Sequence, residues 1–222
     1  MTKIAILIPV YDDWKSLSKL IDKINSNIAG LNFDFSIIAV NDSSFEKQSI
    51  YAPNIENINS LKIINMKENR GHARCIATGL KYIYENEEFS YVIPMDGDGE
   101  DRPEEIKNFI EQIKLNPHKS VVGERIKRSE GLFFKICYNS HKILTFTFTG
   151  QNIKFGNYTC LSKATVEKMI NDKSSWSSFS GALAKLEKDR SSTPSIRGER
   201  YFGPSKMTFK NLILHSLSII SV

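Results

Sequence analysis

The alternation of apolar runs with amphipathic segments constrains the fold of this chain more than any other feature. Short runs rich in β-branched residues predict strands at 3–10, 35–40, 61–66, 91–95 and 120–123. Apolar residues at helical spacing predict helices at 14–28, 73–84 and 103–115. Strands that alternate with helices of about ten to fifteen residues form right-handed crossover units. The sequence therefore predicts an α/β fold with a mixed, mainly parallel sheet flanked by helices.

Beyond Gly123 the periodicity weakens. The apolar and aromatic run 132–148 predicts a helix that covers an opening in the sheet. The segment 174–195 is rich in Ser and Lys, shows no core pattern and is predicted to be a mobile loop. We find no repeat and expect one domain over 1–210. The uncharged segment 211–222 fits a core helix, a membrane-proximal interfacial helix or the start of a membrane segment.

Polar residues follow four successive predicted strands. They occupy 11–13, 41–44, 67–71 and 96–101. Because the carboxyl ends of parallel strands meet at one edge of a sheet, these clusters should be neighbours in space. Core packing does not explain such a pattern, and we expect a nucleotide site at this edge.

The acidic cluster reads D-G-D-G-E from Asp96 to Glu100, directly after a buried strand. Pro103 suits the first turn of the next helix. Closely spaced carboxylates with small residues between them suit Mg²⁺ or Mn²⁺ shared with a phosphate. The alternative is an ordinary acidic strand-to-helix turn, since a D-x-D pattern alone occurs often by chance.

Charge and cysteine usage narrow the classes of partner. The net charge is +5, and basic residues concentrate between Lys185 and Lys210, which suits an anionic partner or, alternatively, a solvated basic face. These residues lack interleaved aromatics, so a nucleic-acid partner is not expected. Three scattered cysteines and four scattered histidines give neither a disulfide framework nor a zinc spacing. We expect a reduced, cytosolic environment and no signal peptide.

In their order along the chain, four segments resemble family 2 glycosyltransferases of the GT-A fold. They are P-V-Y-D-D, N-D-S-S, E-N-R-G-H-A-R-C-I-A-T-G-L and M-D-G-D-G-E-D-R-P-E-E-I. Residues 199–209, E-R-Y-F-G-P-S-K-M-T-F, resemble the R-x-x-G-x-S-K segment of dolichol-phosphate mannose synthases and bacterial polyprenyl-phosphate glycosyltransferases. The resemblance spans roughly 3–215 and implies a Rossmann-like GT-A catalytic domain over 1–210. It implies inverting transfer of a sugar from a nucleotide-sugar donor, such as a UDP- or GDP-sugar.

The resemblance also implies roles for individual residues. The nucleotide-sugar would be bound by Pro9, Tyr11, Asp13, Asp42, Arg70, Gly71, Asp96 and Arg125. For three of these an alternative remains open: Tyr11 as a half-buried strand-end aromatic, Asp42 as an N-cap and Arg70 as a solvated turn residue. The metal, Mg²⁺ or Mn²⁺, would be held by Asp96, Asp98 and Glu100, the last where relatives often carry Gln. The catalytic groups would be Asp96, Asp98, Arg200 and Lys206.

The acceptor implied by the resemblance is a polyprenyl (dolichyl or undecaprenyl) phosphate at the cytosolic face of the membrane. A lipid phosphate is already anionic and needs no catalytic base. None is obvious, because His72 is interpreted as packing at the start of its helix, although Asp101 or an acid within 172–189 remains a candidate. A soluble transferase acting on a glycan or lipid-linked saccharide is the second hypothesis. A silent module that binds nucleotide-sugars or anionic lipids is the third.

Overall fold

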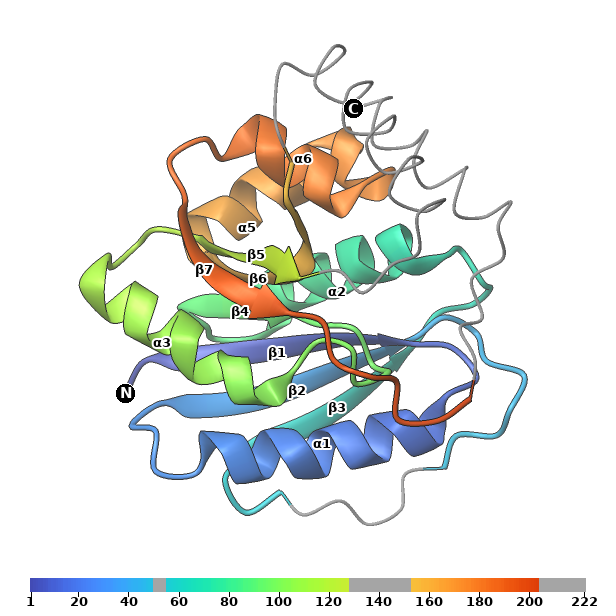
Figure 1. The fold of residues 1–222 in the computed structure, drawn as a ribbon. Coiled ribbons are helices and arrows are strands. Elements are labelled where there is room, and N and C mark those ends of the chain that lie inside the picture. Colours follow the sequence, from blue (N-terminus) through green and yellow to red (C-terminus); the bar gives the residue numbers. More distant parts are fainter. Residues whose placement is uncertain (50–54, 128–152, 204–222) are drawn as a thin grey trace.

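A seven-stranded mixed sheet forms the centre of the protein in the computed structural model, which describes residues 1–49, 55–127 and 153–203 (Figure 1). The strand order is β3-β2-β1-β4-β6-β5-β7. The strands are β1 (Lys3–Val10), β2 (Asp34–Asn41), β3 (Ser60–Asn65), β4 (Tyr91–Pro94), β5 (Val121–Lys127), β6 (Phe155–Ser162) and β7 (Ser191–Ile196). Strands β1 to β4 pair in parallel, β6 runs antiparallel to β4 and β5, and β7 pairs in parallel with β5. The predicted mixed, mainly parallel sheet is confirmed.

Helices cover both faces of the sheet, as the alternating side chains of β1 require. Ile4, Ile6 and Ile8 pack in one cluster with helices α1 (Trp14–Ile28) and α3 (Ile106–Leu115). Ala5 and Leu7 point to the opposite face and pack with α2 (His72–Asn86), α5 (Lys163–Ile170) and α6 (Phe179–Leu186). Figure 1 shows the resulting three layers. Both faces of β1 and β4, and most of β2, are buried, which explains the continuous apolar sequences of these strands.

The amino-terminal elements agree with the predicted ones. Helix α1 has the predicted bounds, and α2 extends the predicted helix at each end. The predicted helix 103–115 consists of a 3₁₀ turn, η1 (Pro103–Glu105), followed by α3, with Pro103 at its start as expected. The carboxyl ends of β1 to β4 therefore meet at one edge, where the polar clusters gather.

The prediction of a mobile loop over 174–195 is wrong. The segment contains the end of the 3₁₀ turn η2 (Lys173–Trp176), helix α6 and most of β7. Phe179 and Leu183 of α6 are buried in the core, and the Ser178 hydroxyl caps the helix by accepting from the amide of Gly181 at 3.2 Å. The serines that obscured the pattern therefore belong to η2, to the start of α6 and to strand β7. The predicted helix over 132–148 and the segment 211–222 lie outside the described residues.

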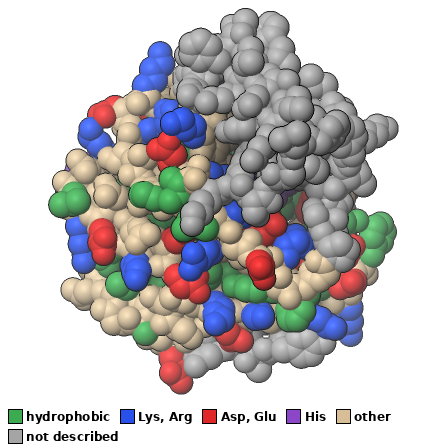
Figure 2. Space-filling view, in the orientation of Figure 1, with side chains coloured by type: hydrophobic (Ala, Val, Ile, Leu, Met, Phe, Trp, Pro, Cys, Tyr) green, Lys and Arg blue, Asp and Glu red, His purple; other side chains and the backbone are tan. Residues whose placement is uncertain are grey.

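The charge distribution of the surface and the length of the helices bear on the expected anionic partner and on membrane attachment. On the face shown in Figure 2, acidic and basic side chains are interspersed over the described part of the surface. None of the helices within the described ranges is long and apolar enough to cross a bilayer. On this face no general basic surface indicates an anionic partner, so an anion site must be sought in particular basic side chains.

Candidate active site

The acidic turn after β4 is folded by its own carboxylates. The amide of Asp96 donates to Asp101 Oδ2 at 2.8 Å, and the amide of Glu100 donates to Asp98 Oδ1 at 2.9 Å. Gly99 has φ +93°, a conformation that side chains rarely adopt. The turn thereby presents the carboxylates of Asp96 and Asp98 at the carboxyl edge of the sheet, as predicted.

Arg200 lies over this turn and joins it to the first strand end. Its Nη1 donates to Asp98 Oδ2, and its Nη2 donates to Asp13 Oδ2 at 3.1 Å. Within the described ranges its Nε is buried and has no acceptor. Three predicted site residues, distant in sequence, are thus brought into one cluster that keeps a buried donor free for a ligand.

Arg200 belongs to residues 197–203, which we call the closing segment. The segment follows β7 and pairs with the acidic turn: the amides of Gly198 and Tyr201 donate to the carbonyl oxygens of Glu100 and Asp98 at 2.7 and 2.9 Å. Arg197 forms an ion pair with the Glu100 carboxylate. The Tyr201 ring covers Gly99, where an added Cβ would lie 2.6 Å from the ring. Glycine at this position therefore permits the segment to dock.

A buried carboxylate of η1 holds the end of β7, which leads into the closing segment. Glu105, which is 7% exposed, accepts from the Ser195 hydroxyl at 2.7 Å and from the Ile196 amide at 2.9 Å. Ser195 and Ile196 end β7 immediately before the closing segment. The position of Arg200 thus depends on Glu105, for which the sequence analysis assigned no role.

His72 lies at the acidic turn, which corrects its interpretation as a packing residue. It is the first residue of α2, and its Nε2 lies 3.3 Å from Asp96 Oδ1. Asn157 on β6 lies between them, with its Nδ2 2.7 Å from His72 Nε2 and 3.5 Å from Asp96 Oδ1. His72 directly follows the strand-end cluster 67–71, and this position in the sequence could have indicated that it lies in the site. Asn157 comes from the antiparallel strand that was not predicted, so its part in the site was missed.

The charges of the turn shift the pKa values of its carboxyl groups in opposite directions. Burial raises the pKa of Asp98 to about 6, and the neighbouring charge of Asp96 adds to this. Burial acts the same way on Asp96, but the hydrogen bond and charge of His72 outweigh it and hold the pKa of Asp96 below its usual range. Burial opposes protonation of His72, yet the contact with Asp96 raises its pKa. Burial and the charge of Asp96 raise the pKa of Asp101.

Asp42 organises the turn between β3 and α2. Its two carboxylate oxygens accept from the backbone amides of Arg70 and Gly71, each at 2.8 Å, and the residue is 4% exposed. Gly71 has φ +86°, so glycine suits this turn. The side chain of Arg70 forms an ion pair with Glu68. Asp42 therefore fixes the turn that leads into His72 and the start of α2.

Tyr11 forms part of an aromatic pair that connects the ends of β1 and β2. Its ring meets Phe45 edge-on, with centroids 6.4 Å apart, and Phe45 is 91% exposed. The amide of Asp12 donates to the Ser44 hydroxyl at 2.9 Å, which holds the two loops together. The pair, half-buried at Tyr11 and exposed at Phe45, provides apolar aromatic surface at the ends of β1 and β2.

The remaining predicted residues are placed as follows. Pro9 is buried near the end of β1, and its carbonyl oxygen is 3.1 Å from the position of a Cβ on Gly97. The guanidinium of Arg125 on β5 packs against Gly156, and its charge helps to lower the pKa of Asp96. Lys206 lies outside the described residues.

The donor set of the turn fits a metal ion shared with a ligand. The described part of the chain holds no cluster of three or more His, Cys, Asp or Glu side chains arranged around a metal position. Mg²⁺ commonly takes one or two carboxylates and completes its shell with phosphate oxygens and water. Asp96 and Asp98 could provide such a partial shell, in which Arg200 would share the Asp98 carboxylate with the ion, and Glu100 is paired with Arg197.

Comparison with known proteins gives a family and a fold. Residues 5–169 match the family described as Glycosyl transferase family 2. Glucosyl-3-phosphoglycerate synthase from Mycobacterium tuberculosis, solved with Mn²⁺, UDP-glucose and phosphoglyceric acid, is 13% identical with a TM-score of 0.66. The similarity covers 99% of this chain and 78% of that chain. The same enzyme with Mg²⁺ and UDP gives 12% identity and a TM-score of 0.63, over 99% and 77% of the two chains.

A second neighbour is larger than this chain. S. aureus TarS 1-349 is 15% identical with a TM-score of 0.51, and the match covers 90% of this chain but 59% of that chain. At such identities the neighbours establish a shared GT-A fold and nothing about substrate. The predicted GT-A architecture is therefore confirmed, while the specific resemblance to polyprenyl-phosphate enzymes finds no counterpart among these neighbours.

Proposed function

The chain belongs to glycosyl transferase family 2, and from that premise we propose that it transfers one sugar, with inversion, from a nucleotide-sugar to a polyprenyl phosphate. The observation that carries this proposal is the position of Arg200, which joins Asp98 and Asp13 at the carboxyl edge of the sheet. Departure of a nucleoside diphosphate builds negative charge at this place. Preorganised cations at such a position are a large source of rate enhancement.

Asp96 and Asp98 would hold Mg²⁺ or Mn²⁺, the ions found with UDP in the M. tuberculosis enzyme. The ion, when bound, neutralises charge on the diphosphate. His72 and Asn157 would orient the Asp96 carboxylate, and the buried Nε of Arg200, which has no acceptor among the described residues, would donate to a phosphate oxygen. Lys206, the other cation of the R-x-x-G-x-S-K pattern, is proposed to add a mobile charge.

The nucleoside would lie over the ends of β1 and β2. Tyr11 and Phe45 offer an apolar surface for the base, and Asp13 lies between this surface and Arg200. Asp42 would act indirectly, because its carboxylate is occupied by the turn of Arg70 and Gly71. Arg125 contributes positive charge from β5. UDP-glucose is the first donor to test, since the M. tuberculosis enzyme binds it.

A phosphate acceptor is supported by the engagement of the two groups at the described turn that could act as a base. His72 Nε2 lies 3.3 Å from Asp96 Oδ1, and this contact raises the pKa of His72 and so favours its protonated form. Asp101 is 6% exposed and accepts from the Asp96 amide, so it is committed to the fold. An ionised phosphate needs no deprotonation before it attacks. Attachment to the cytosolic membrane face is part of the proposal and relies on the apolar segment 211–222 that follows a basic region.

A small soluble phosphorylated acceptor is the second candidate. The M. tuberculosis enzyme of the same fold binds phosphoglyceric acid, which also presents an anionic oxygen. A neutral glycan acceptor would require a base, and the two candidates at the acidic turn, His72 and Asp101, are both engaged by Asp96. The order of acceptors to test is therefore polyprenyl phosphate, phosphoglycerate and neutral saccharides.

The test is release of nucleoside diphosphate from a panel of UDP- and GDP-sugars with Mn²⁺ or Mg²⁺. Each donor is combined with undecaprenyl phosphate in detergent, with phosphoglycerate or with a neutral saccharide mixture, and Asp98→Asn serves as the inactive control. Release that requires undecaprenyl phosphate supports the proposal. Release of nucleoside diphosphate with phosphoglycerate but not with undecaprenyl phosphate would support the second candidate, a small soluble phosphorylated acceptor. Donor binding without release in any mixture identifies a binding module and refutes the enzymatic proposal.

A further inference from the structure

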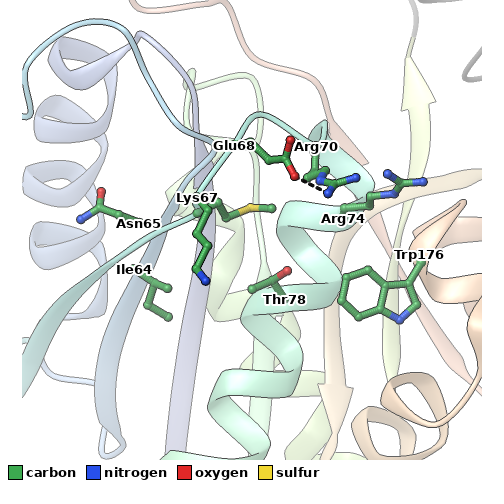
Figure 3. A pocket seen from close by; sticks show the side chains of 9 residues that line it. Ile64, Asn65, Lys67, Glu68, Arg70, Arg74, Thr78 and Trp176 are labelled. Carbon is green, nitrogen blue, oxygen red and sulfur yellow. Dashed lines mark hydrogen bonds and ion pairs between the residues drawn. The ribbon is translucent and has the colours of Figure 1, made fainter.

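A cleft of about 720 Å³ lies on the side of α2 that faces away from the acidic turn. It is bounded by the end of β3, the first turns of α2 and the 3₁₀ turn η2 (Figure 3). His72 of α2 contacts Asp96, whereas Arg74 and Thr78 line the cleft. Successive helical residues are about 100° apart, so Arg74 and Thr78 share the face opposite His72. The cleft is therefore separated from the acidic turn by the width of a helix, about 10 Å.

The cleft carries an excess of positive charge. Lys67, Arg70 and Arg74 line it together with one acid, Glu68. Arg70 forms an ion pair with Glu68, as the dashed line in Figure 3 shows. Neither Lys67 nor Arg74 has an ion-pair partner among the residues that the structure describes. Lys67 and Arg74, together with the guanidinium that Arg70 shares with Glu68, therefore line the same cleft.

An exposed tryptophan forms the other wall. Trp176 is 40% exposed, whereas Trp14, the other tryptophan of the chain, is 1% exposed and belongs to the core. The indole of Trp176 lies beside Arg74 and Thr78 in Figure 3. Ile64 and Met66 of the β3 end add apolar surface. An indole face packs against hydrocarbon or a sugar ring, and the adjacent cations suit an anionic group.

We infer that this cleft binds a second phosphate-bearing ligand, distinct from the nucleotide-sugar. Arg74 and Lys67 contact the phosphate, and Trp176 packs against the apolar or ring-shaped body of the ligand. The volume accommodates a hexose phosphate or a phospholipid headgroup, since small-molecule sites usually occupy about 300–1,000 Å³. Both sources share the same chemistry, a phosphate next to a body of low polarity. The inference does not depend on the transfer reaction, because none of the cleft cations contacts the acidic turn.

Trp176 provides a direct readout of this site. The intact chain is titrated in EDTA, so that metal-dependent phosphate binding at Asp96 and Asp98 does not contribute. One arm uses glucose 6-phosphate, and the other uses phosphatidylcholine vesicles with and without phosphatidylglycerol. We expect a change in tryptophan emission and protection of Trp176 from acrylamide, while the buried Trp14 contributes little to quenching. A response to glucose 6-phosphate identifies a soluble ligand, and a response only to anionic vesicles identifies a lipid headgroup.

Matched variants locate the binding. Arg74→Gln and Lys67→Gln should each weaken binding of the responding probe about tenfold, the effect of losing a charged hydrogen bond. Lys81→Gln removes an equivalent charge from an exposed position further along α2 and should leave binding unchanged. Asp98→Asn should also bind normally, which separates this site from the donor site. Thermal unfolding of each variant checks that it folds. Silence with both probes, or equal affinity in Arg74→Gln, Lys67→Gln and Lys81→Gln, overturns the inference.

Discussion

Arg200 donates through Nη1 to Asp98, a residue 102 positions earlier in the chain. The same guanidinium reaches Asp13 at 3.1 Å, so one side chain bridges two strand ends. It supplies positive charge to a carboxylate that belongs to the proposed metal site. Arg200 thus occupies the place where the proposed reaction needs positive charge.

Replacing Arg200 should separate catalysis from metal binding. We expect Arg200→Gln to lower turnover about 10²-fold or more, as loss of a preorganised electrostatic donor typically does. Affinity for Mn²⁺ should not fall, because the substitution frees Asp98. Steady-state kinetics and Mn²⁺ titration by electron paramagnetic resonance measure the two effects. Lys81→Gln, which removes an exposed charge of α2 outside the acidic turn, is the control. Turnover equal in both variants would exclude Arg200 from the site.

The raised pKa of Asp98, about 6 in place of 3.8, predicts a stability gain for Asp98→Asn. Because the folded protein binds this proton more tightly than the unfolded chain, ionisation destabilises the fold. The penalty is absent below about pH 4, grows as the pH rises to about 6 and is complete above it. In EDTA at neutral pH we expect Asp98→Asn to unfold with a free energy about 1–3 kcal/mol higher than wild type.

The check is denaturant unfolding of Asp98→Asn and wild type at several pH values. The difference in unfolding free energy should shrink as the pH is lowered toward 4. Glu111→Gln, an exposed carboxylate on α3, should show no such dependence. A difference that is constant with pH would contradict the raised pKa.

The first half of the fold could be predicted from the sequence because the hydrophobic pattern of each segment agrees with the strand–helix alternation of the whole region. Strands β1 and β4 are buried on both faces, β2 is nearly so and the edge strand β3 is half-buried, and each is an apolar run that ends in polar residues. The same agreement located Asp96, Asp98 and Asp13, since the ends of parallel strands must meet at one edge. The second half offered no such agreement. Helix α6 has only eight residues, and β6 is antiparallel, so the expected strand–helix alternation breaks down there.

What the sequence could not show was how the distant groups combine. The resemblance placed Arg200 in the site without identifying its partners, and Glu105, Tyr201 and Asn157 had no signal of their own. Their roles arise from tertiary contacts, such as the bonds of Glu105 to the end of β7. Such contacts have no periodicity that a sequence pattern can reveal.

Gly99 should tolerate no side chain while Tyr201 covers it. An added Cβ would lie 2.6 Å from the tyrosine ring, and φ is +93°. Gly30 also has a positive φ, +76°, but nothing lies within 4 Å of its Cβ position. We expect Gly30→Ala to cost about 1–2 kcal/mol from backbone strain alone. Gly99→Ala should cost about 1–3 kcal/mol more, because overpacking adds to the strain.

Unfolding free energies and turnover of the two glycine variants test this difference. Combining Gly99→Ala with Tyr201→Ala should recover part of the loss in a double-mutant cycle, since the clash is with that ring. Equal costs for Gly30→Ala and Gly99→Ala would show that the Tyr201 contact is unimportant.

His72 should support metal binding by orienting Asp96. We expect His72→Ala to weaken Mn²⁺ binding in the presence of UDP about 10-fold or more, the usual effect of losing a group that positions a metal ligand. His72→Gln retains a side-chain donor toward Asp96 and should lose less. Calorimetric titration of Mn²⁺ distinguishes the two. If both variants bind Mn²⁺ like wild type, His72 has only a packing role.

Glu105 should hold the closing segment in position through its hydrogen bonds to the end of β7. Glu105→Ala leaves the Ser195 hydroxyl and Ile196 amide without their acceptor and should cost about 2–3 kcal/mol. Hydrogen exchange should increase over residues 191–203, and turnover should fall with it. Glu104→Ala, whose carboxylate is 44% exposed beside Arg102, should change stability by less than about 1 kcal/mol. Unchanged hydrogen exchange over residues 191–203 in Glu105→Ala would show that Glu105 does not hold the closing segment.

The distance in sequence between Arg200 and its partners also bears on biosynthesis. Its two acceptors precede it by 102 and 187 residues. A nascent chain that has emerged from the ribosome as far as α3 already contains the acidic turn and the first strand-end loops. It lacks the guanidinium that opposes their charge, because β7 must first pair with β5 at the far edge of the sheet. Catalytic competence should therefore appear late in translation, well after the amino-terminal half has been able to collapse.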